Sequence, residues 1–145
     1  MDIRSKIILI AGPTASGKSK FAIKLAKKIN GEIINADSMQ IYKQLKILTA
    51  RPSDHDQSKV KHHLYGFLSV KKNFSTGIWL KLVIKKIKEI QKRNKVPIIV
   101  GGTGLYFKAL TEGLVKIPNI PLKVRNETMS LQEKIGQKQF YKRLI

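Results

Sequence analysis

A glycine-rich loop between an apolar run and an amphipathic segment constrains this chain more than any other part of its sequence. Residues 7–11 are Ile, Leu and Ala, a pattern typical of a central parallel strand that is buried on both faces. Residues 12–19 follow with the spacing G-x4-G-K-S, and apolar residues then recur at helical intervals through residues 18–30. A strand, this loop and a helix in that order are the context of a P-loop, so we expect a phosphate-binding site here.

The residues of the loop indicate how a polyphosphate is held. Glycines let successive backbone N–H groups curl around phosphate oxygens at the N-terminus of a helix. Lys18 adds a full positive charge, and the hydroxyl of Ser19 can reach a phosphate-bound Mg²⁺, which we expect as the cofactor. The residues predicted to bind a diphosphate or a nucleotide are Gly12, Pro13, Thr14, Ala15, Ser16, Gly17, Lys18 and Ser19.

The rest of the chain continues the alternation of strands and helices. Residues 32–36 form a second predicted strand and residues 96–100 a third, with a helix capped by Ser75 between them. This order predicts an α/β fold, a P-loop NTPase-like parallel sheet with flanking helices. The remaining expectations are an irregular segment at 43–61, a short extended piece at 62–67, a helix at 105–110 and a basic helical stretch at 122–145.

Asp37 directly follows the second predicted strand. Ligands of open α/β sheets bind in the crevice outside the carboxyl ends of the strands, and a carboxylate there can accept a proton from an attacking amine. Ser38 and Gln40 can read the edge of a base by hydrogen bonds, whereas the alternative is that Asp37 is only a surface turn or cap. The Gly-Gly-Thr-Gly segment at 101–104 follows the third strand, and either lets Thr103 approach a ligand or forms a plain turn.

Two further patterns limit the chemistry. Ordinary P-loop NTPases end a strand in an Asp that binds Mg²⁺, but here the third strand ends in Gly101-Gly102. This weakens an ATPase or GTPase interpretation and leaves open a small P-loop kinase in which Asp37 holds an acceptor hydroxyl. The pair His62-His63 is a poor metal site, because neighbouring strand residues point to opposite faces and no third ligand has a useful spacing.

Composition indicates a polyanionic partner without naming one. The chain has 145 residues, 29 Lys and Arg against 9 Asp and Glu, and a net charge of +20, which attracts nucleic acid. The alternative source of this charge is compositional drift, since 24 of the 29 cations are Lys beside 20 Ile. The absence of Cys excludes disulfides and thiolate zinc sites and fits a cytoplasmic protein.

Four segments, taken together and in order, resemble one family, the tRNA dimethylallyltransferases or tRNA isopentenyltransferases. The resemblance runs from about Lys6 to Arg125, and the combination is far more specific than a P-loop alone. The matching segments are GPTASGKS at 12–19, DSMQIY at 37–42, TARP at 49–52 with HHL at 62–64, and VPIIVGGTGLY at 96–106.

This resemblance implies transfer of a dimethylallyl group from dimethylallyl diphosphate to the exocyclic N6 of the adenosine next to the tRNA anticodon. The implied catalytic residues are Asp37, Lys18 and Thr103, with Asp37 orienting N6 and taking its proton. Pyrophosphate is then the leaving group, and the P-loop stabilises its developing charge. The tRNA-binding residues implied by the resemblance are Asp37, Ser38, Met39, Gln40, Thr103 and Arg125.

The resemblance also sets expectations for domains and partners. Residues 1–115 correspond to the N-terminal part of a P-loop transferase core, and residues 116–145 to a connector and the start of a helical tRNA-binding insertion. Because family members are considerably longer, we expect the chain to be truncated and its core sheet incomplete. We expect a monomer without membrane contact, with tRNA and dimethylallyl diphosphate as partners.

Three positions depart from the family pattern. Gln44 and Leu48 stand where we expect glycines, and Arg51 stands where we expect a lysine. These departures affect the loop after Asp37 and leave the catalytic set intact. A transferase acting on free adenine nucleotides and an inactive RNA-binding fragment are the alternatives that stay open beside the kinase.

Overall fold

The computed structural model describes residues 6–115, 118 and 120–143, and the chain forms two compact units, Met1–Leu114 and Val115–Ile145. The first unit holds every described helix and strand except α5. Its elements are β1 (Ile8–Ala11), α1 (Lys18–Ile29), β2 (Gly31–Asn35), the 3-10 helix η2 (Lys43–Leu45), α2 (Asp54–Lys59), β3 (His62–His63), α3 (Thr76–Lys92), β4 (Val96–Gly101) and α4 (Gly104–Glu112). The described helix of the second unit is α5 (Leu122–Lys142).

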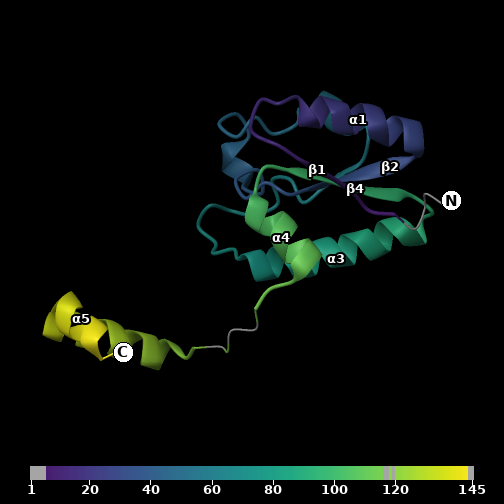
Figure 1. Cartoon of the computed structure of the whole chain (residues 1–145). Coiled ribbons are helices and arrows are strands. Elements are labelled where there is room, and N and C mark those ends of the chain that lie inside the picture. The colour runs from purple at the N-terminus through teal and green to yellow at the C-terminus, as the bar shows by residue number, and fades with distance from the viewer. Residues whose placement is uncertain (1–5, 116–117, 119, 144–145) are drawn as a thin grey trace. The chain divides into compact units, whose positions relative to one another are not determined.

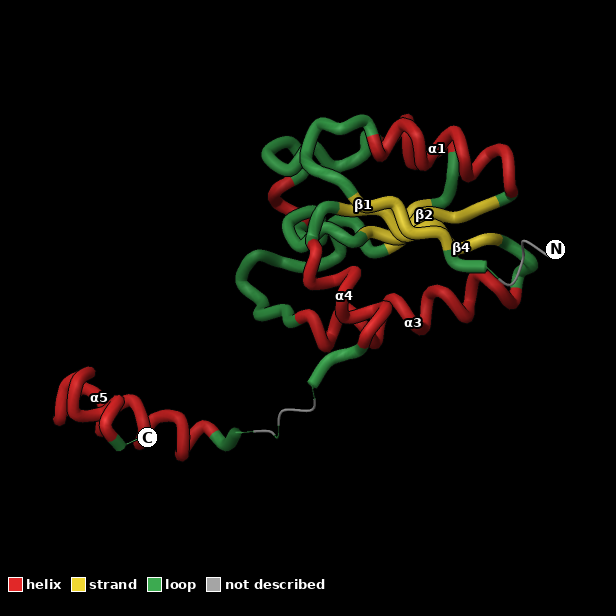
Figure 2. Tube along the Cα trace, viewed as in Figure 1, coloured by secondary structure: helices red, strands yellow, loops and turns green. Residues whose placement is uncertain are grey.

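The strands form one parallel sheet in the order β1-β4-β2-β3. Figure 2 shows the strands gathered in one layer between helices. Helix α1 covers one face of this sheet, and helices α3 and α4 cover the other (Figure 1). The predicted P-loop NTPase-like parallel sheet with flanking helices is therefore confirmed. Since all strands run in the same direction, the loops after β1, β2 and β4 leave the sheet at the same end, and these loops carry the predicted site residues of the first unit.

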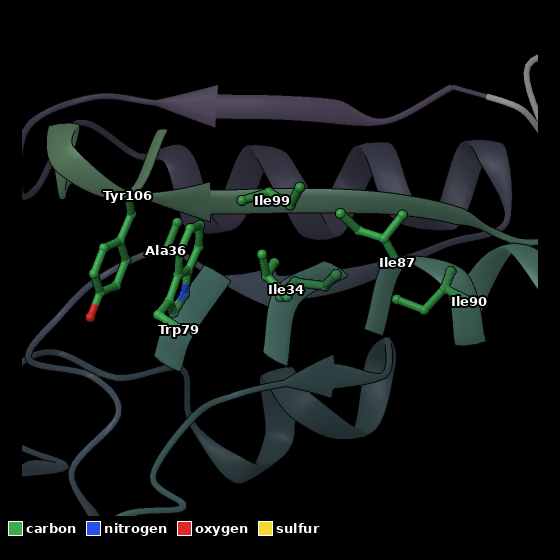
Figure 3. Close-up of a cluster of buried hydrophobic side chains, with 8 residues drawn as sticks. Ile34, Ala36, Trp79, Ile87, Ile90, Ile99 and Tyr106 are labelled. Carbon is green, nitrogen blue, oxygen red and sulfur yellow. The ribbon is translucent and has the colours of Figure 1, made fainter. Parts of the chain in front are cut away.

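Helix α3 packs on one face of the sheet and holds the carboxyl end of β2 in place. Ser75 caps α3 by accepting a hydrogen bond from the amide of Ile78 at 3.2 Å. The buried face of the helix then packs on Ile34 and Ile99 of the sheet (Figure 3). Trp79 is fully buried and its indole N–H donates to the carbonyl of Asn35 at 2.9 Å. Burial and a satisfied donor together anchor the last residue of β2.

The opposite face is covered by a helix with small residues toward the sheet. Ala22 and Ala26 of α1 are buried against Ile33 and Ile98. Helix α1 ends at Ile29 and its C-cap, Asn30, has a left-handed φ of 54°, after which β2 begins at Gly31. This confirms the predicted order of strand, loop, helix and strand in the first part of the chain.

Strand β1 corrects one sequence prediction. We expected a central strand buried on both faces, but β1 is an edge strand of the described sheet and pairs with β4 alone. Ile7 is 44% and Leu9 40% exposed. The apolar run is real, but local composition does not report which strand lies beside it, so burial on both faces could not follow from the pattern.

The segment before β3 also differs from expectation. Residues 43–61 were predicted to be irregular, yet they contain η2 and α2. Ser53 caps α2 by accepting a hydrogen bond from the amide of Asp56 at 3.1 Å. The extended piece expected at 62–67 is reduced to the two residues of β3, which pair with Ile33 and Ile34.

Helix α5 of the second unit has no buried residue. Leu131, Ile135 and Phe140 are only partly covered. The helical stretch predicted at 122–145 is interrupted at Gly136, whose φ of 75° and ψ of 158° are not helical. The predicted helical residues 144 and 145 lie outside the described residues. Within the described part of the chain, no helix combines the length and the apolar character needed to cross a bilayer.

Candidate functional site

The P-loop joins β1 to α1 in a conformation that presents backbone amides. Ala15 and Gly17 both have positive φ, 64° and 81°, and Gly17 is the N-cap of α1. The ammonium of Lys18 folds back over the loop and donates to the carbonyl of Pro13 at 2.8 Å. The positive end of the helix dipole and the Lys18 ammonium lie at the same loop, which is the arrangement that favours an anion.

The close approach of β4 to β2 explains one glycine of the second loop. A Cβ on Gly101 would lie 2.0 Å from the carbonyl oxygen of Ala36, which excludes any side chain at this position. The amide of Ala36 donates to Val100 at 2.8 Å, and the amide of Thr103 donates to Ala36 at 3.2 Å. The glycine loop after β4 is thus pressed against the end of β2, beside Asp37.

Asp37 is fixed by Asn35, which is fully buried. The amide of Asp37 donates to the Asn35 Oδ1 at 2.9 Å, and the Asn35 side-chain amide donates to the carbonyls of Asp37 at 2.9 Å and Leu64 at 3.1 Å. The Asp37 Oδ1 accepts from the amides of Met39 at 2.9 Å and Gln40 at 3.3 Å. One carboxylate oxygen therefore sets the turn, and the other has no hydrogen bond to a described residue.

Thr103 is tied to the loop that carries Asp37. The amide of Ser38 donates to the Thr103 hydroxyl oxygen at 2.9 Å, and this hydroxyl donates to the Ser38 Oγ at 3.4 Å. The side-chain amide of Gln40 donates to the carbonyl of Thr49 at 2.8 Å, while Met39 is exposed. Three of the predicted tRNA-binding residues thus also hold the loops of the site together.

One cavity of about 690 Å³ joins these elements. Its lining includes the predicted residues Thr14, Ala15, Gly17, Lys18, Ser19, Asp37 and Gln40. The remaining predicted residues of the first unit lie outside this lining, namely Gly12, Pro13, Ser16, Ser38, Met39 and Thr103. Arg125 lies on α5 in the second unit, where it is exposed.

Another part of the cavity wall consists of residues that were not predicted to belong to the site. Ala50 and Pro52 add apolar surface to the cavity, and Arg51 and Tyr65 add polar groups. Burial, and to a smaller extent the charge of Asp37, raises the pKa of the Tyr65 phenol, so this group stays protonated at neutral pH. A cavity with phosphate-binding, carboxylate and apolar parts suits an anionic ligand with an apolar tail.

The missed residues carried weak signals. Residues 49–52 were part of the matching segments, but nothing in their spacing indicated that they line the site. Asn35 is a polar residue that directly follows Ile33 and Ile34 in the predicted strand, and this position was its only sequence signal. Its partner Leu64 is 29 residues away, a separation that no local periodicity reports.

The amino end of β2 carries a second charged group, Glu32, which is 1% exposed. Its Oε2 accepts from His63 Nε2 at 2.6 Å and from Arg93 at 2.8 Å, and its Oε1 lies 3.1 Å from the Lys95 ammonium. Burial raises the pKa of Glu32, but the hydrogen bonds from these three partners outweigh it and lower the pKa to about 2. His62 instead contacts the carbonyl of Val60 at 2.6 Å, so the two histidines have different partners.

The fold is that of a P-loop NTPase-like α/β protein, and its cavity is lined both by residues of the G-x4-G-K-S loop and by the carboxylate of Asp37. A family model described as IPP transferase matches residues 40–145. The tRNA dimethylallyltransferase of Pelagibacter ubique (strain HTCC1062) is 67% identical over 145 residues, 100% of this chain and 46% of that protein. The tRNA dimethylallyltransferase of Parvibaculum lavamentivorans (strain DS-1 / DSM 13023 / NCIMB 13966) is 54% identical over 120 residues, 83% of this chain and 38% of that protein.

Solved structures of tRNA-modifying transferases are also similar to this chain. A full-length tRNA isopentenylpyrophosphate transferase from Bacillus halodurans has a TM-score of 0.75 and 34% identity, covering 96% of this chain and 46% of that one. A eukaryotic dimethylallyltransferase acting on tRNA has a TM-score of 0.76 and 31% identity, covering 90% of this chain and 32% of that one. The chain belongs to the IPP transferase family, and it spans less than half the length of each of these relatives.

Proposed function

We propose that this chain carries the donor-binding and proton-accepting part of a tRNA dimethylallyltransferase. The reaction moves a dimethylallyl group from dimethylallyl diphosphate to the N6 of the adenosine next to the anticodon. The observation that carries the proposal is that Lys18, Ser19 and Asp37 line one cavity. Such a cavity holds a leaving diphosphate and a proton acceptor side by side, as prenyl transfer to an amine requires.

The chemistry follows from these groups. The bond between the allylic carbon and the diphosphate oxygen breaks, and its electron pair goes to the diphosphate, whose added charge is stabilised by the loop amides and Lys18. N6 attacks the allylic carbon with its lone pair, and its proton passes to Asp37. The Asp37 Oδ1 is held by backbone amides, which leaves the second carboxylate oxygen to orient N6 and accept this proton.

The donor set fits Mg²⁺ that arrives with the diphosphate. Among the described residues, no group of three or more His, Asp or Glu side chains could hold a metal alone. The Ser19 hydroxyl lines the cavity beside the P-loop, and Mg²⁺ commonly binds one or two protein oxygens together with phosphate oxygens and water. When bound, Mg²⁺ would neutralise part of the charge of the leaving diphosphate.

The acceptor side of the proposal concerns tRNA. The adenosine has to leave its stack to reach the cavity, which costs a few kcal/mol and requires compensating contacts. We assign these contacts to Ser38, Met39, Gln40 and Thr103 around Asp37, and to Arg125 on α5. Residues 1–115 then act as the P-loop transferase core and residues 116–145 begin the tRNA-binding insertion of a cytoplasmic monomer.

A transfer assay tests the proposal. The protein is incubated with Mg²⁺, dimethylallyl diphosphate and an anticodon stem-loop that has an adenosine next to the anticodon, and digested nucleosides are examined by mass spectrometry. We expect N6-dimethylallyl-adenosine, and no product when guanosine replaces that adenosine. Equal binding of ATP and dimethylallyl diphosphate, with phosphoryl transfer from ATP to a small acceptor, would instead support the kinase interpretation and contradict the proposal.

A further inference from the structure

Arg51 lies on a segment whose backbone is held from two sides. The carbonyl of Thr49 accepts from the side chain of Gln40 at 2.8 Å, and the amide of Arg51 donates to the carbonyl of Lys46 at 3.1 Å. Ala50 between them has a left-handed φ of 47°. This segment forms part of the wall of the cavity that also contains the P-loop. The position of Arg51 is therefore built into the fold of the loop.

The guanidinium of Arg51 packs against other residues, but not all of its N–H groups have hydrogen-bond partners. Its Nη1 donates to the carbonyl of Tyr42 at 3.2 Å. A Cβ on Gly66 would lie 1.7 Å from this Nη1, so the absence of a side chain at Gly66 makes room for the guanidinium. The Nε is buried, and among the described residues it is the one buried side-chain nitrogen or oxygen without a hydrogen-bond partner. Because the Nε is covered by protein, it would not itself contact a ligand, and it shows only that the protein does not supply acceptors for all the N–H groups of Arg51.

No described carboxylate neutralises Arg51 in an ion pair. The other cation from this side of the cavity, Lys59, is paired with Asp56 at 3.2 Å. Lys46, which forms an ion pair with Asp54 at 2.8 Å, lowers the pKa of Asp54 most, and the charge of Arg51 lowers this pKa less. Arg51 thus adds an uncompensated positive charge to the cavity that holds Lys18.

We propose that Arg51 is a second cationic ligand of the donor's diphosphate, acting together with the P-loop. This inference rests on the proposed function and adds a residue to it. An arginine offers a rigid planar fork of N–H donors that matches phosphate oxygens two at a time. When the allylic C–O bond breaks and its electron pair moves to the diphosphate, Arg51 stabilises the added charge, so it counts as a catalytic residue that touches the leaving group.

The test uses inorganic pyrophosphate with Mg²⁺ as the probe and isothermal titration calorimetry as the measurement. Arg51→Gln should weaken binding roughly ten- to hundredfold, the usual effect of losing a charge-assisted hydrogen bond. Arg51→Lys, which keeps the charge and loses the fork, should fall between Arg51→Gln and the unchanged protein. Lys43→Gln removes one charge from an exposed position outside the cavity lining and should bind like the unchanged protein.

A second measurement covers the case in which Arg51→Gln does not fold. Phenylglyoxal modifies arginines of the unchanged protein, and peptide mass spectrometry reports each site. Pyrophosphate should protect Arg51 and leave exposed Arg125 reactive. Protection of no arginine, or a folded Arg51→Gln variant with unchanged affinity, would overturn the assignment.

The two proposals fail in different ways. If the unchanged protein binds no pyrophosphate, the diphosphate site and the proposed function both fail. Only the assignment of Arg51 fails if the unchanged protein binds pyrophosphate, Lys18→Ala abolishes this binding, and Arg51→Gln leaves it unchanged.

Discussion

The two ends of β2 each carry a buried or half-buried carboxylate, and the chain treats them in opposite ways. Glu32 at the amino end is 1% exposed and has three partners, the cations Arg93 and Lys95 and the imidazole of His63. Asp37, just beyond the carboxyl end, has no described cationic partner and lines the cavity. A carboxylate whose charge is fully matched stabilises the fold, whereas one that is held by a single oxygen keeps the other for chemistry.

Conversion of Asp37 to Asn should produce the largest effect and act on catalysis alone. The amide keeps the size and one oxygen for the turn but cannot take the proton of N6. We expect dimethylallyl transfer to fall by about 10³-fold, within the range for loss of a general base, with nearly unchanged unfolding by urea. Transfer assays and pyrophosphate calorimetry on the same variant check this. A variant that transfers at the normal rate would remove Asp37 from the mechanism.

Conversion of Glu32 to Gln should mainly lower the stability of the fold, in contrast to the change at Asp37. It leaves Arg93 and Lys95 facing a neutral group in a buried position, and we expect the free energy of unfolding to fall by about 2–4 kcal/mol. The value lies toward the lower end because both cationic side chains are partly exposed. Urea unfolding followed by circular dichroism measures it. An unchanged free energy of unfolding would mean that the ion pairs at this end contribute no stability.

The pH dependence of stability should separate the two ends further. The pKa of Glu32 is about 2 in the folded chain against an ordinary 4.5, so the unfolded chain binds more protons between these values. Stability from Glu32 is therefore complete above pH 4.5 and is lost as the pH falls toward 2, by about 3 kcal/mol. Urea titrations at pH 6, 4 and 3 should show this loss in the unchanged protein and a smaller loss in Glu32→Gln.

The histidines add a separate component at higher pH. Burial lowers the pKa of His62 and of His63 in the folded chain. Protonation therefore favours the unfolded state, and stability should also decline as the pH falls below about 6.5. Because Glu32→Gln keeps His62 unchanged, a decline in this range should persist in the variant.

Conversion of Lys95 to Gln should give the smallest effect. Its side chain is 35% exposed, so solvent screens its attraction to Glu32, and Arg93 and His63 remain. We expect less than about 1 kcal/mol of lost stability in urea, decreasing further in high salt. A loss as large as that of Glu32→Gln would show that one partner, rather than the cluster, holds the carboxylate.

The sequence predicted the elements whose signals are local. The P-loop, helix α1 and the strand before Asp37 follow from glycine spacing and apolar periodicity within about 30 residues. It did not predict that β1 lies at an edge of the described sheet, because the neighbour of a strand is chosen by distant segments. It also missed α2, a six-residue helix whose signal is the Ser53 cap followed by acidic residues.

By itself, the sequence determined a glycine-rich loop between a strand and a helix, the parallel alternation of strands and helices, and Asp37 at a strand end. Each of these depends on backbone conformations that neighbouring residues set. Only the tertiary structure decided that Glu32 forms ion pairs while Asp37 has none with a described residue, and that Arg51 lines the same cavity as Lys18. The residues in each of these groups are about 30 to 60 positions apart in the sequence, and the energies of their interactions depend on burial and distance, which exist only after the chain has folded.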